Sequence, residues 1–450
     1  MGDKKTIFIL GAGASASAKI PTQAGLLPLI FSINRKTFEV SSFPSDFLSI
    51  EIDGGLQRIA DCYEKFDSFR RTLGEFIVIN FASEQTAARY LMLVQYADSI
   101  IESSVGEQDK RDTLLLQAYS IVRDLDATLE DIFTIFDSVA AGRQHFRLYS
   151  PQKMDDIHQM LKMCIIYALS VAISTDCDVK DYDDFCRYLL DARLQSAQKE
   201  DPLSVVTTNW DDLLEQRLFH LCGEYNNKQT REANKIYPDL CFYNYDLSNS
   251  TKHVPSTHVK ARGYRNIKVL KMHGSLAWLE CPRCGRIFTD FSDEIAAEEF
   301  SNMPCPFCKQ EQRGHSGNPK LRNLIITPTF LKSLDNLSLK NIWQNAYIDI
   351  SEANHLVFIG YSLPAADFEM RCLLKKAIKK DTKITVVLRE SSNPEVVKKN
   401  FVDHGFSEEE AIRLIRRMDM PVQRYISFFG EGRVEFFYNG FGDYIKSIRG

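Results

Sequence analysis

The chain has 450 residues, 44% of them hydrophobic, and its 60 acidic residues slightly outnumber its 55 Lys and Arg residues. This length buries a large core in roughly two to three domains. The net charge of −5, without a long basic block, argues against a protein that coats nucleic acid, so any contact with nucleic acid is expected to be indirect.

The start of the chain, "MGDKKTIFIL", enters a strand-like segment without the pattern of a signal peptide. The longest candidate membrane segment, "MCIIYALSVAIS", is too short to span a bilayer. Seven of the 11 cysteines are scattered and four fall in two Cys-x-x-Cys pairs, a usage that suits a reducing compartment and one metal site. We therefore expect a cytoplasmic protein without a membrane partner.

Short apolar segments bounded by turn residues predict buried parallel strands. They are "TIFIL" (6–10), "SVVTT" (204–208), "IKVLKM" (267–272), "NLIIT" (323–327), "HLVFIG" (355–360) and "ITVVL" (384–388). The long stretch between the first two segments has helical periodicity. The sequence therefore predicts an α/β fold, with a Rossmann-like parallel sheet interrupted by a large helical insertion.

This pattern divides the chain into six predicted parts. They are the first strand and glycine-rich turn (1–33), the helical insertion (34–200), the continued core with the candidate motifs (201–280), a zinc ribbon (281–320), the completed core (321–390) and a C-terminal extension (391–450), in which "RVEFFYNGFGDYI" predicts a strand and a turn.

A glycine-rich turn follows the first strand. Gly11, Gly13 and Ala16 fit a G-x-G-x-x-G/A pattern, in which small residues let a helix N-terminus approach a pyrophosphate. A tight turn with no ligand explains the pattern equally well. The P-loop frame fails because Lys19 is not preceded by Gly. No acidic residue is evident about 20 positions later, so a standard dehydrogenase is not expected.

Polar side chains follow two further predicted strands. Thr208, Asn209 and Asp211 come where "SVVTT" ends, a position that faces the ligand crevice of a parallel sheet. The alternative is that Asn209 or Asp211 caps the helix predicted at "LLEQRLF". His273 follows "IKVLKM" and precedes Gly274. A lone histidine is more often a packed structural residue, but its place at a strand end makes it a candidate for the site.

Four cysteines form the most specific motif of the chain. Cys281 and Cys284 make one Cys-x-x-Cys pair, and Cys305 and Cys308 make a second pair after twenty intervening residues. Four thiolates complete the tetrahedral coordination of Zn²⁺ and leave no position for substrate or water. The spacing therefore predicts a structural zinc site; unligated thiols and a redox pair are the less favoured alternatives.

The order of these motifs resembles the sirtuin NAD-binding fold, and more closely its bacterial antiphage-defence branch of NAD hydrolases. "TLEDIFTIFD" and "GYSLPAADFEMRCLL" look like that branch. Where sirtuins carry Gly-Ile-Pro-Asp-Phe-Arg, this chain keeps Ile-Pro and loses Asp-Phe-Arg. Where deacylases carry a Phe-Gly-Glu segment that holds the acyl-lysine peptide, it reads "NLIITPTFLKS". These departures argue against deacylase activity.

The resemblance also implies roles for individual residues, with NAD⁺ as substrate. Asn209 and His273 correspond to the catalytic pair, Asp211 to the family aspartate that meets the nicotinamide carboxamide, and Thr208 to the Gln before the catalytic Asn. The remaining positions implied to bind NAD⁺ are Gly11, Ala12, Gly13 and Ser15 at the pyrophosphate, Pro21 and Thr22 in the segment that lies against NAD⁺, and Gly360 and Ser362 beside the adenosine ribose.

The expected function is therefore NAD⁺ hydrolysis, giving nicotinamide and ADP-ribose, in a defence effector that depletes NAD⁺ when it is activated. Control is expected from homo-oligomerisation or from a partner protein, which in related systems is a HerA-type ATPase or an Argonaute. Two alternatives stay open: an NAD-dependent protein deacylase, and a non-catalytic module that binds NAD⁺ or ADP-ribose.

Overall fold

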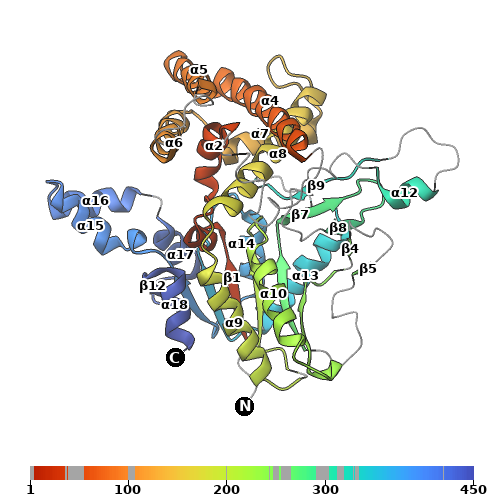
Figure 1. Ribbon diagram of the computed structural model, residues 1–450. Coiled ribbons are helices and arrows are strands. Elements are labelled where there is room, and N and C mark those ends of the chain that lie inside the picture. The colour runs from red at the N-terminus through yellow and green to blue at the C-terminus, as the bar shows by residue number, and fades with distance from the viewer. Residues whose placement is uncertain are drawn as a thin grey trace.

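The computed structural model describes residues 5–35, 38, 55–99, 107–198, 200–242, 244–246, 253–254, 265–289, 304–311, 319–327, 329, 334–418 and 420–449. In Figure 1, a parallel sheet with flanking helices occupies the lower part of the molecule, a layer of helices lies above it, and a smaller sheet extends to the right. This arrangement confirms the predicted α/β class with a helical insertion.

The main sheet has seven strands in the order β12-β11-β10-β1-β2-β6-β3, and each neighbouring pair is parallel. The strands are β1 (Thr6–Leu10), β2 (Leu203–Thr207), β3 (Ile236–Asp239), β6 (Arg265–Lys271), β10 (His355–Ile359), β11 (Lys383–Val387) and β12 (Val434–Phe437). The central strands are almost fully buried, as their apolar runs require when helices cover a parallel sheet.

Four central strands end at the same level. Leu10 of β1 pairs with Ile359 of β10 on one side and with Thr207 of β2 on the other, and Thr207 pairs with Lys271 of β6. From β1 the chain runs outward through β2 and β6 on one side, and through β10, β11 and β12 on the other. The strand order therefore reverses beside β1, which is where open α/β sheets bind ligands.

The helical layer consists mainly of α4 (Gly55–Phe81), α5 (Glu84–Ser99), α6 (Glu107–Arg123), α7 (Leu129–Gly142) and α8 (Pro151–Asp176). It is anchored by α2 (Gln23–Ser32), which packs against α6 and α8. Below this layer, α9 (Lys180–Gln195) packs against α10 (Leu213–Asn226) and against α18 (Gly440–Arg449), and α13 (Leu337–Glu352) packs against α14 (Phe368–Ala377).

One of these helices corrects an expectation from the sequence. Within the described residues, the stretch Pro151–Ser174 of α8 is long and apolar enough to cross a membrane by length and composition. The sequence had suggested that no segment is long enough. In the structure, 61% of its most apolar window is buried, as in the core helix of a globular layer.

The predicted strand "NLIIT" belongs to a different sheet. A second sheet has the order β5-β4-β8-β7-β9, with β4 (Asn244–Asp246), β5 (His253–Val254), β7 (Gly274–Glu280), β8 (Ile287–Thr289) and β9 (Arg322–Ile325). β9 runs antiparallel to β7, so its assignment to the parallel sheet is wrong. The reason is that the chain turns out of the main sheet after β6 and returns beside β7.

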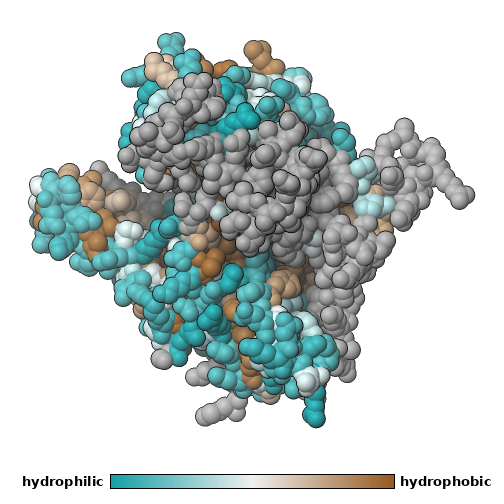
Figure 2. Space-filling view, viewed as in Figure 1, coloured by the Kyte–Doolittle hydropathy of each residue, from teal (hydrophilic) through white to brown (hydrophobic). Residues whose placement is uncertain are grey.

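The C-terminal segment contributes to the core. β12 pairs with β11 and extends the main sheet, although the sequence placed these residues in an extension. Before it, α15 (Pro394–Asp403) and α16 (Glu408–Arg417) form the arm at the left of Figure 1, followed by α17 (Pro421–Phe429). Among the coloured residues of Figure 2, hydrophilic side chains predominate, with hydrophobic ones at the top of the molecule and on this arm.

Candidate functional site

A cavity of about 970 Å³ lies at the carboxyl ends of the central strands. Apart from Gly11 and the four cysteines, every site residue that the sequence suggested lines this cavity: Ala12, Gly13, Ser15, Pro21, Thr22, Thr208, Asn209, Asp211, His273, Gly360 and Ser362. These residues follow β1, β2, β6 and β10, so the cavity occupies the point where the strand order reverses. Its volume is in the upper part of the range for small-molecule sites, about 300–1,000 Å³.

The glycine-rich turn is held tightly against the end of β10. The N–H of Gly11 donates to the carbonyl of Ile359 (3.0 Å), and the N–H of Gly13 donates to that of Gly360 (2.9 Å). Gly360 has a φ of 60°, and a Cβ there would lie 2.0 Å from the nitrogen of Ala14. Glycine is therefore required at this contact. The predicted phosphate cradle needs correction, because two of its amides already have backbone partners.

The helix after this turn is also shorter than the phosphate-binding pattern implies. It consists of the four-residue α1 (Ala12–Ser15) and a 3₁₀ turn, η1 (Ala16–Ala18). A helix this short has a small dipole, so it contributes little of the anion binding expected at the start of a long helix. The turn mainly places Ser15.

The hydroxyl of Ser15 is the centre of a buried polar network. It donates to Oδ2 of Asp211 (2.7 Å) and accepts from Nδ2 of Asn209 (2.9 Å). Its third contact is the hydroxyl of Tyr182 in α9, at 2.7 Å. Because Ser15 has a single proton, Tyr182 is the donor in this contact. Burial, and after it the charge of Asp211, raise the pKa of Tyr182 well above its usual value, so the phenol keeps this proton.

Asn209 combines a fixed orientation with an unused acceptor. Its N–H donates to Oγ1 of Thr207 (3.1 Å), its Nδ2 is held by Ser15, and only 6% of the residue is exposed. Its Oδ1 atom has no hydrogen-bond partner among the described residues. A buried acceptor without a partner costs about 1–3 kcal/mol. The amide oxygen is therefore suited to accept a hydrogen bond from a molecule in the cavity.

The alternative of a helix cap is wrong for this segment. The residue that precedes α10 at its N-terminus is Asp212, and no side chain makes a capping hydrogen bond there. Asn209 and Asp211 instead contact Ser15. These two side chains therefore line the cavity and do not cap α10.

The backbone at His273 is fixed by hydrogen bonds to two successive carbonyl groups. Its carbonyl accepts from the N–H of Ile326 (2.9 Å), and the carbonyl of the preceding Met272 accepts from Nε1 of Trp343 (3.0 Å). Gly274 has a φ of 75°, and a Cβ there would lie 2.0 Å from the carbonyl oxygen of Leu324. The turn after β6 therefore requires glycine, and it holds the imidazole at the wall of the cavity.

The side chain of His273 has a partner that the sequence analysis did not single out. Its Nε2 atom lies 3.2 Å from Oδ1 of Asp367, and both side chains are buried. The motif "GYSLPAADFEMRCLL" contains this aspartate, but nothing in it indicates contact with a histidine 94 positions earlier. Tyr182 was missed as well, because the helical insertion carries no signal that one of its tyrosines reaches the glycine turn.

A buried ion pair supports the loop that carries Asn209. Nζ of Lys271 lies 2.7 Å from Oε1 of Glu215, both side chains are 1% exposed, and the same ammonium group donates to the carbonyl of Asp211. Burial, and after it the charge of Glu215, raise the pKa of the neighbouring Asp212 to about 6. The loop between β2 and α10 therefore contains a carboxyl group whose charge is costly at neutral pH.

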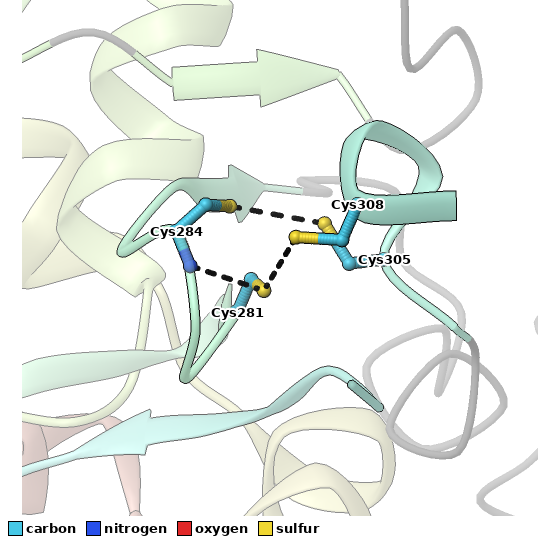
Figure 3. Close-up of side chains that lie close together, drawn as sticks. All are labelled: Cys281, Cys284, Cys305 and Cys308. Atoms are coloured by element: carbon cyan, nitrogen blue, oxygen red, sulfur yellow. Dashed lines mark hydrogen bonds between the residues drawn. The ribbon is translucent and has the colours of Figure 1, made fainter. Parts of the chain in front are cut away.

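The four cysteines lie outside the cavity, beside the smaller sheet, and their side chains point toward one another (Figure 3). All four sulfur atoms lie within 4.8 Å of one another, with Sγ of Cys281 3.7 Å from that of Cys308, and Sγ of Cys284 3.8 Å from that of Cys305. A tetrahedral Zn²⁺ with Zn–S bonds of about 2.3 Å requires S···S distances of about 3.8 Å. The donor set therefore fits a structural Zn²⁺ with no open position.

Comparison with known proteins finds a match to a described domain family over part of the chain. A family model described as a SIR2-like domain matches residues 203–415, which include Asn209, His273 and the four cysteines. No curated protein matches the chain. A solved Sir2 homologue in complex with NAD is 14% identical, with 70% of this chain and 84% of that chain covered and a TM-score of 0.32.

Two further solved structures resemble the chain weakly. Sir2Tm bound to a propionylated peptide is 12% identical, with 86% of this chain and 81% of that chain covered and a TM-score of 0.27. A mutant Sir2 homologue in complex with ADP-ribose is also 12% identical, with 95% and 94% covered and a TM-score of 0.29.

Replacing Asp212 by Asn tests the buried carboxyl group. Because its pKa is raised from 3.8 to about 6 in the folded state, the protonated form stabilises the wild type at low pH, and this stability is lost as the pH rises through 6. We expect the unfolding free energy of Asp212→Asn to match that of the wild type at about pH 4 and to exceed it by about 2–3 kcal/mol at about pH 7. Urea unfolding at both pH values measures this difference, with the exposed Asp381→Asn as control; a difference that does not change with pH would contradict the assignment.

Replacing Cys281 by Ser tests the metal site. Because all four thiolates are needed to complete one tetrahedral ion, we expect the variant to lose most of its bound zinc and to melt at a lower temperature than the wild type. Cys372→Ser, which changes a thiol outside the cluster, is expected to keep both. Metal analysis and thermal unfolding are measured on the same preparations. A zinc-free Cys281→Ser protein with wild-type stability would show that the cluster is not a structural metal site.

Proposed function

We propose that the chain is an NAD⁺ hydrolase, which cleaves the bond between nicotinamide and ribose and releases nicotinamide and ADP-ribose. The observation that carries this proposal is the shared position of Asn209 and His273. Thr207 pairs with Lys271, and the two candidate side chains each come two residues after this pair, at the wall of one cavity. An amide and an imidazole from neighbouring strands thus face the same space as the glycine turn.

The chemistry of NAD⁺ suits such a site. The nicotinamide ring is cationic in the substrate, so it leaves with the bonding electrons as a neutral molecule and needs no proton. The pair of carboxylic acids that ordinary glycosidases use to protonate the leaving group and activate water is therefore unnecessary. What remains is to position the ribose and to remove one proton from the attacking water.

The residues divide this work. Oδ1 of Asn209 accepts a hydrogen bond from the water or from a ribose hydroxyl near C1′, and a neutral His273 takes the proton as the water oxygen bonds to C1′. Asp211 accepts a hydrogen bond from the nicotinamide carboxamide. Ser15 is saturated by its three contacts, so it orients Asn209 and Asp211 instead of meeting a phosphate.

The phosphate charge has other partners in the same cavity. Arg389, Arg424 and Lys446 line the part of it formed by the C-terminal segment. The guanidinium of Arg424 donates to the carbonyl of Ser362 (3.2 Å), two residues after Gly360. The N–H groups of Gly11 and Gly13 already donate to backbone carbonyls. We infer that these cations and the N–H of Ala12 bind the pyrophosphate in their place.

The segment after the smaller sheet favours hydrolysis over deacylation. In deacylases of the family that the sequence resembles, this segment holds the acyl-lysine peptide. Here the N–H of Ile326 donates to His273, and its carbonyl accepts from Nε1 of Trp210 (3.1 Å). Asp137 of α7 accepts hydrogen bonds from Thr327 (3.3 Å) and Thr329 (2.8 Å). The backbone N–H and carbonyl of Ile326, with which an extended peptide could pair, are therefore already engaged by His273 and Trp210.

We further propose that the hydrolase is a defence effector whose activity is switched on by self-assembly or by a partner protein such as a HerA-type ATPase or an Argonaute. The support for this is the sequence resemblance of "TLEDIFTIFD" and "GYSLPAADFEMRCLL" to the antiphage branch. Each assay below is therefore run with the isolated chain and again with any partner encoded beside it.

Incubation of the purified protein with NAD⁺, with and without an acetyl-lysine peptide, tests the proposed activity. We expect free nicotinamide and ADP-ribose without peptide, because water is the acceptor. O-acetyl-ADP-ribose formed only with peptide would instead identify a deacylase. Binding of NAD⁺ without any product, in the presence of the partner, would identify a non-catalytic module.

Substitution of the two candidate side chains tests their roles. We expect Asn209→Ala and His273→Ala each to lower the rate of NAD⁺ cleavage by about 10² or more, the usual scale for a positioned acid–base group. Because both groups would serve one transition state, the double variant is expected to be scarcely slower than the slower single variant.

Melting temperature is measured on the same preparations as the control for folding. Wild-type turnover in folded His273→Ala protein would contradict the catalytic assignment and leave His273 as a packed structural residue. The matched control is His220→Ala, which removes an exposed imidazole outside the cavity and is expected to leave turnover unchanged.

A further inference from the structure

Asp367 occupies a helix-capping position without acting as a cap. It immediately precedes α14 at its N-terminus, and its side chain makes no capping hydrogen bond. Aspartate at such a position usually accepts from a backbone N–H of the first turn, which stabilises a helix by about 1 kcal/mol. Here the carboxylate forgoes that contact and lies in the buried space between His273 and Tyr361.

Both oxygens of this carboxylate are engaged. Oδ1 lies 3.2 Å from Nε2 of His273, and Oδ2 accepts from the hydroxyl of Tyr361 at 2.6 Å. Tyr361 is itself held in place, because its carbonyl accepts from the hydroxyl of Tyr425 in α17 (2.8 Å). Burial, and after it the charge of Asp367, raise the pKa of Tyr361 well above its usual value, so its phenol remains a donor.

We propose, on the basis of the NAD⁺ hydrolase function above, that Asp367 is the positioning residue for His273 and that Tyr361 fixes its carboxylate. A carboxylate beside Nε2 holds the imidazole proton on that nitrogen, so the lone pair of the neutral ring is on Nδ1. The proton removed from the attacking water is then received by the imidazole of His273. Asp367 keeps its negative charge throughout and stabilises the imidazolium that forms.

The carboxylate of Asp367, 3.2 Å from Nε2, is placed to stabilise the imidazolium that forms when His273 takes a proton. An opposite charge within about 4–6 Å shifts a pKa by about 1–3 units toward the charged form. Among the residues that the structure describes, charged or titratable groups around the dyad include Arg371 in the first turn of α14, Tyr425 in α17, and Asp211 and Arg424 at the cavity wall. All of these stay in place in an Asp367 variant, so a change in the titration of His273 reports on the carboxylate.

Asp367→Asn is a sharp test, because Asn matches Asp in shape and in helix-capping preference. The protein is labelled with ¹³C in its histidine rings, and the signal of His273 is identified by its absence in His273→Gln. We expect Asp367→Asn to lower the pKa of His273 by about one unit or more. Asp443→Asn removes a carboxylate that lines the same cavity and pairs with Lys446, and it is expected to leave this pKa unchanged.

The pH profile of NAD⁺ cleavage gives a second readout. Because His273 must be neutral to accept a proton, a lower pKa moves the acidic limb of the profile of Asp367→Asn to lower pH by the same amount. We also expect kcat to fall by about tenfold or more while KM stays close to the wild-type value. Asp367→Glu restores the charge at a different distance, and it is expected to recover part of the shift in the limb.

The two measurements separate this inference from the proposed function. An unchanged pKa of His273 in folded Asp367→Asn protein would overturn the positioning role, whatever the activity. A lowered pKa in a protein whose wild type does not cleave NAD⁺, even with its partner present, would support the contact between Asp367 and His273 and refute the hydrolase.

Discussion

The candidate site depends on the register of four parallel strands. Since Ile359, Leu10, Thr207 and Lys271 pair side by side, β10, β1, β2 and β6 end at one level, and the segments that follow them meet in a single cavity. A buried ion cluster holds the opposite ends of the strands. Lys5 before β1 and Lys268 in β6 both contact Asp349 of α13, at 2.7 and 3.0 Å. A slip of one residue in β2 would move Asn209 away from the cavity, and a slip in β6 would move His273.

Each of the two central side chains is held by a partner from a distant part of the chain. Asn209 is bonded to Ser15, which in turn contacts Tyr182 of α9, while His273 contacts Asp367 at the start of α14. The long helical insertion is therefore part of the site, since its last helix completes the network around Ser15. Buried polar groups that are paired in this way specify one arrangement of the site, while Oδ1 of Asn209 stays without a partner among the described residues.

The sequence predicted what depends on local pattern. Apolar runs located β1, β2, β6, β10 and β11 of the parallel sheet but not β3, and the positions of Asn209 and His273 just after two of these strands placed them at the same edge. Other features depend on which segments meet in space. "NLIIT" is as apolar as a central strand, but the turn at Gly274 had already carried the chain into a second sheet. The sequence alone does not show that the N–H groups of Gly11 and Gly13 are bonded to the end of β10 and so cannot bind a phosphate. Likewise, no local pattern connects Tyr182 with Ser15 or Asp367 with His273.

The most direct measurement is a crystal structure of the His273→Ala variant soaked with NAD⁺. The account predicts intact NAD⁺ in the cavity at the carboxyl ends of the strands, with the C1′ atom of the nicotinamide ribose beside the side chain of Asn209 and facing the space left by the imidazole. Density for the dinucleotide at another place on the protein, or its nicotinamide ribose turned away from both residues, would contradict the claim that Asn209 and His273 act on one bond.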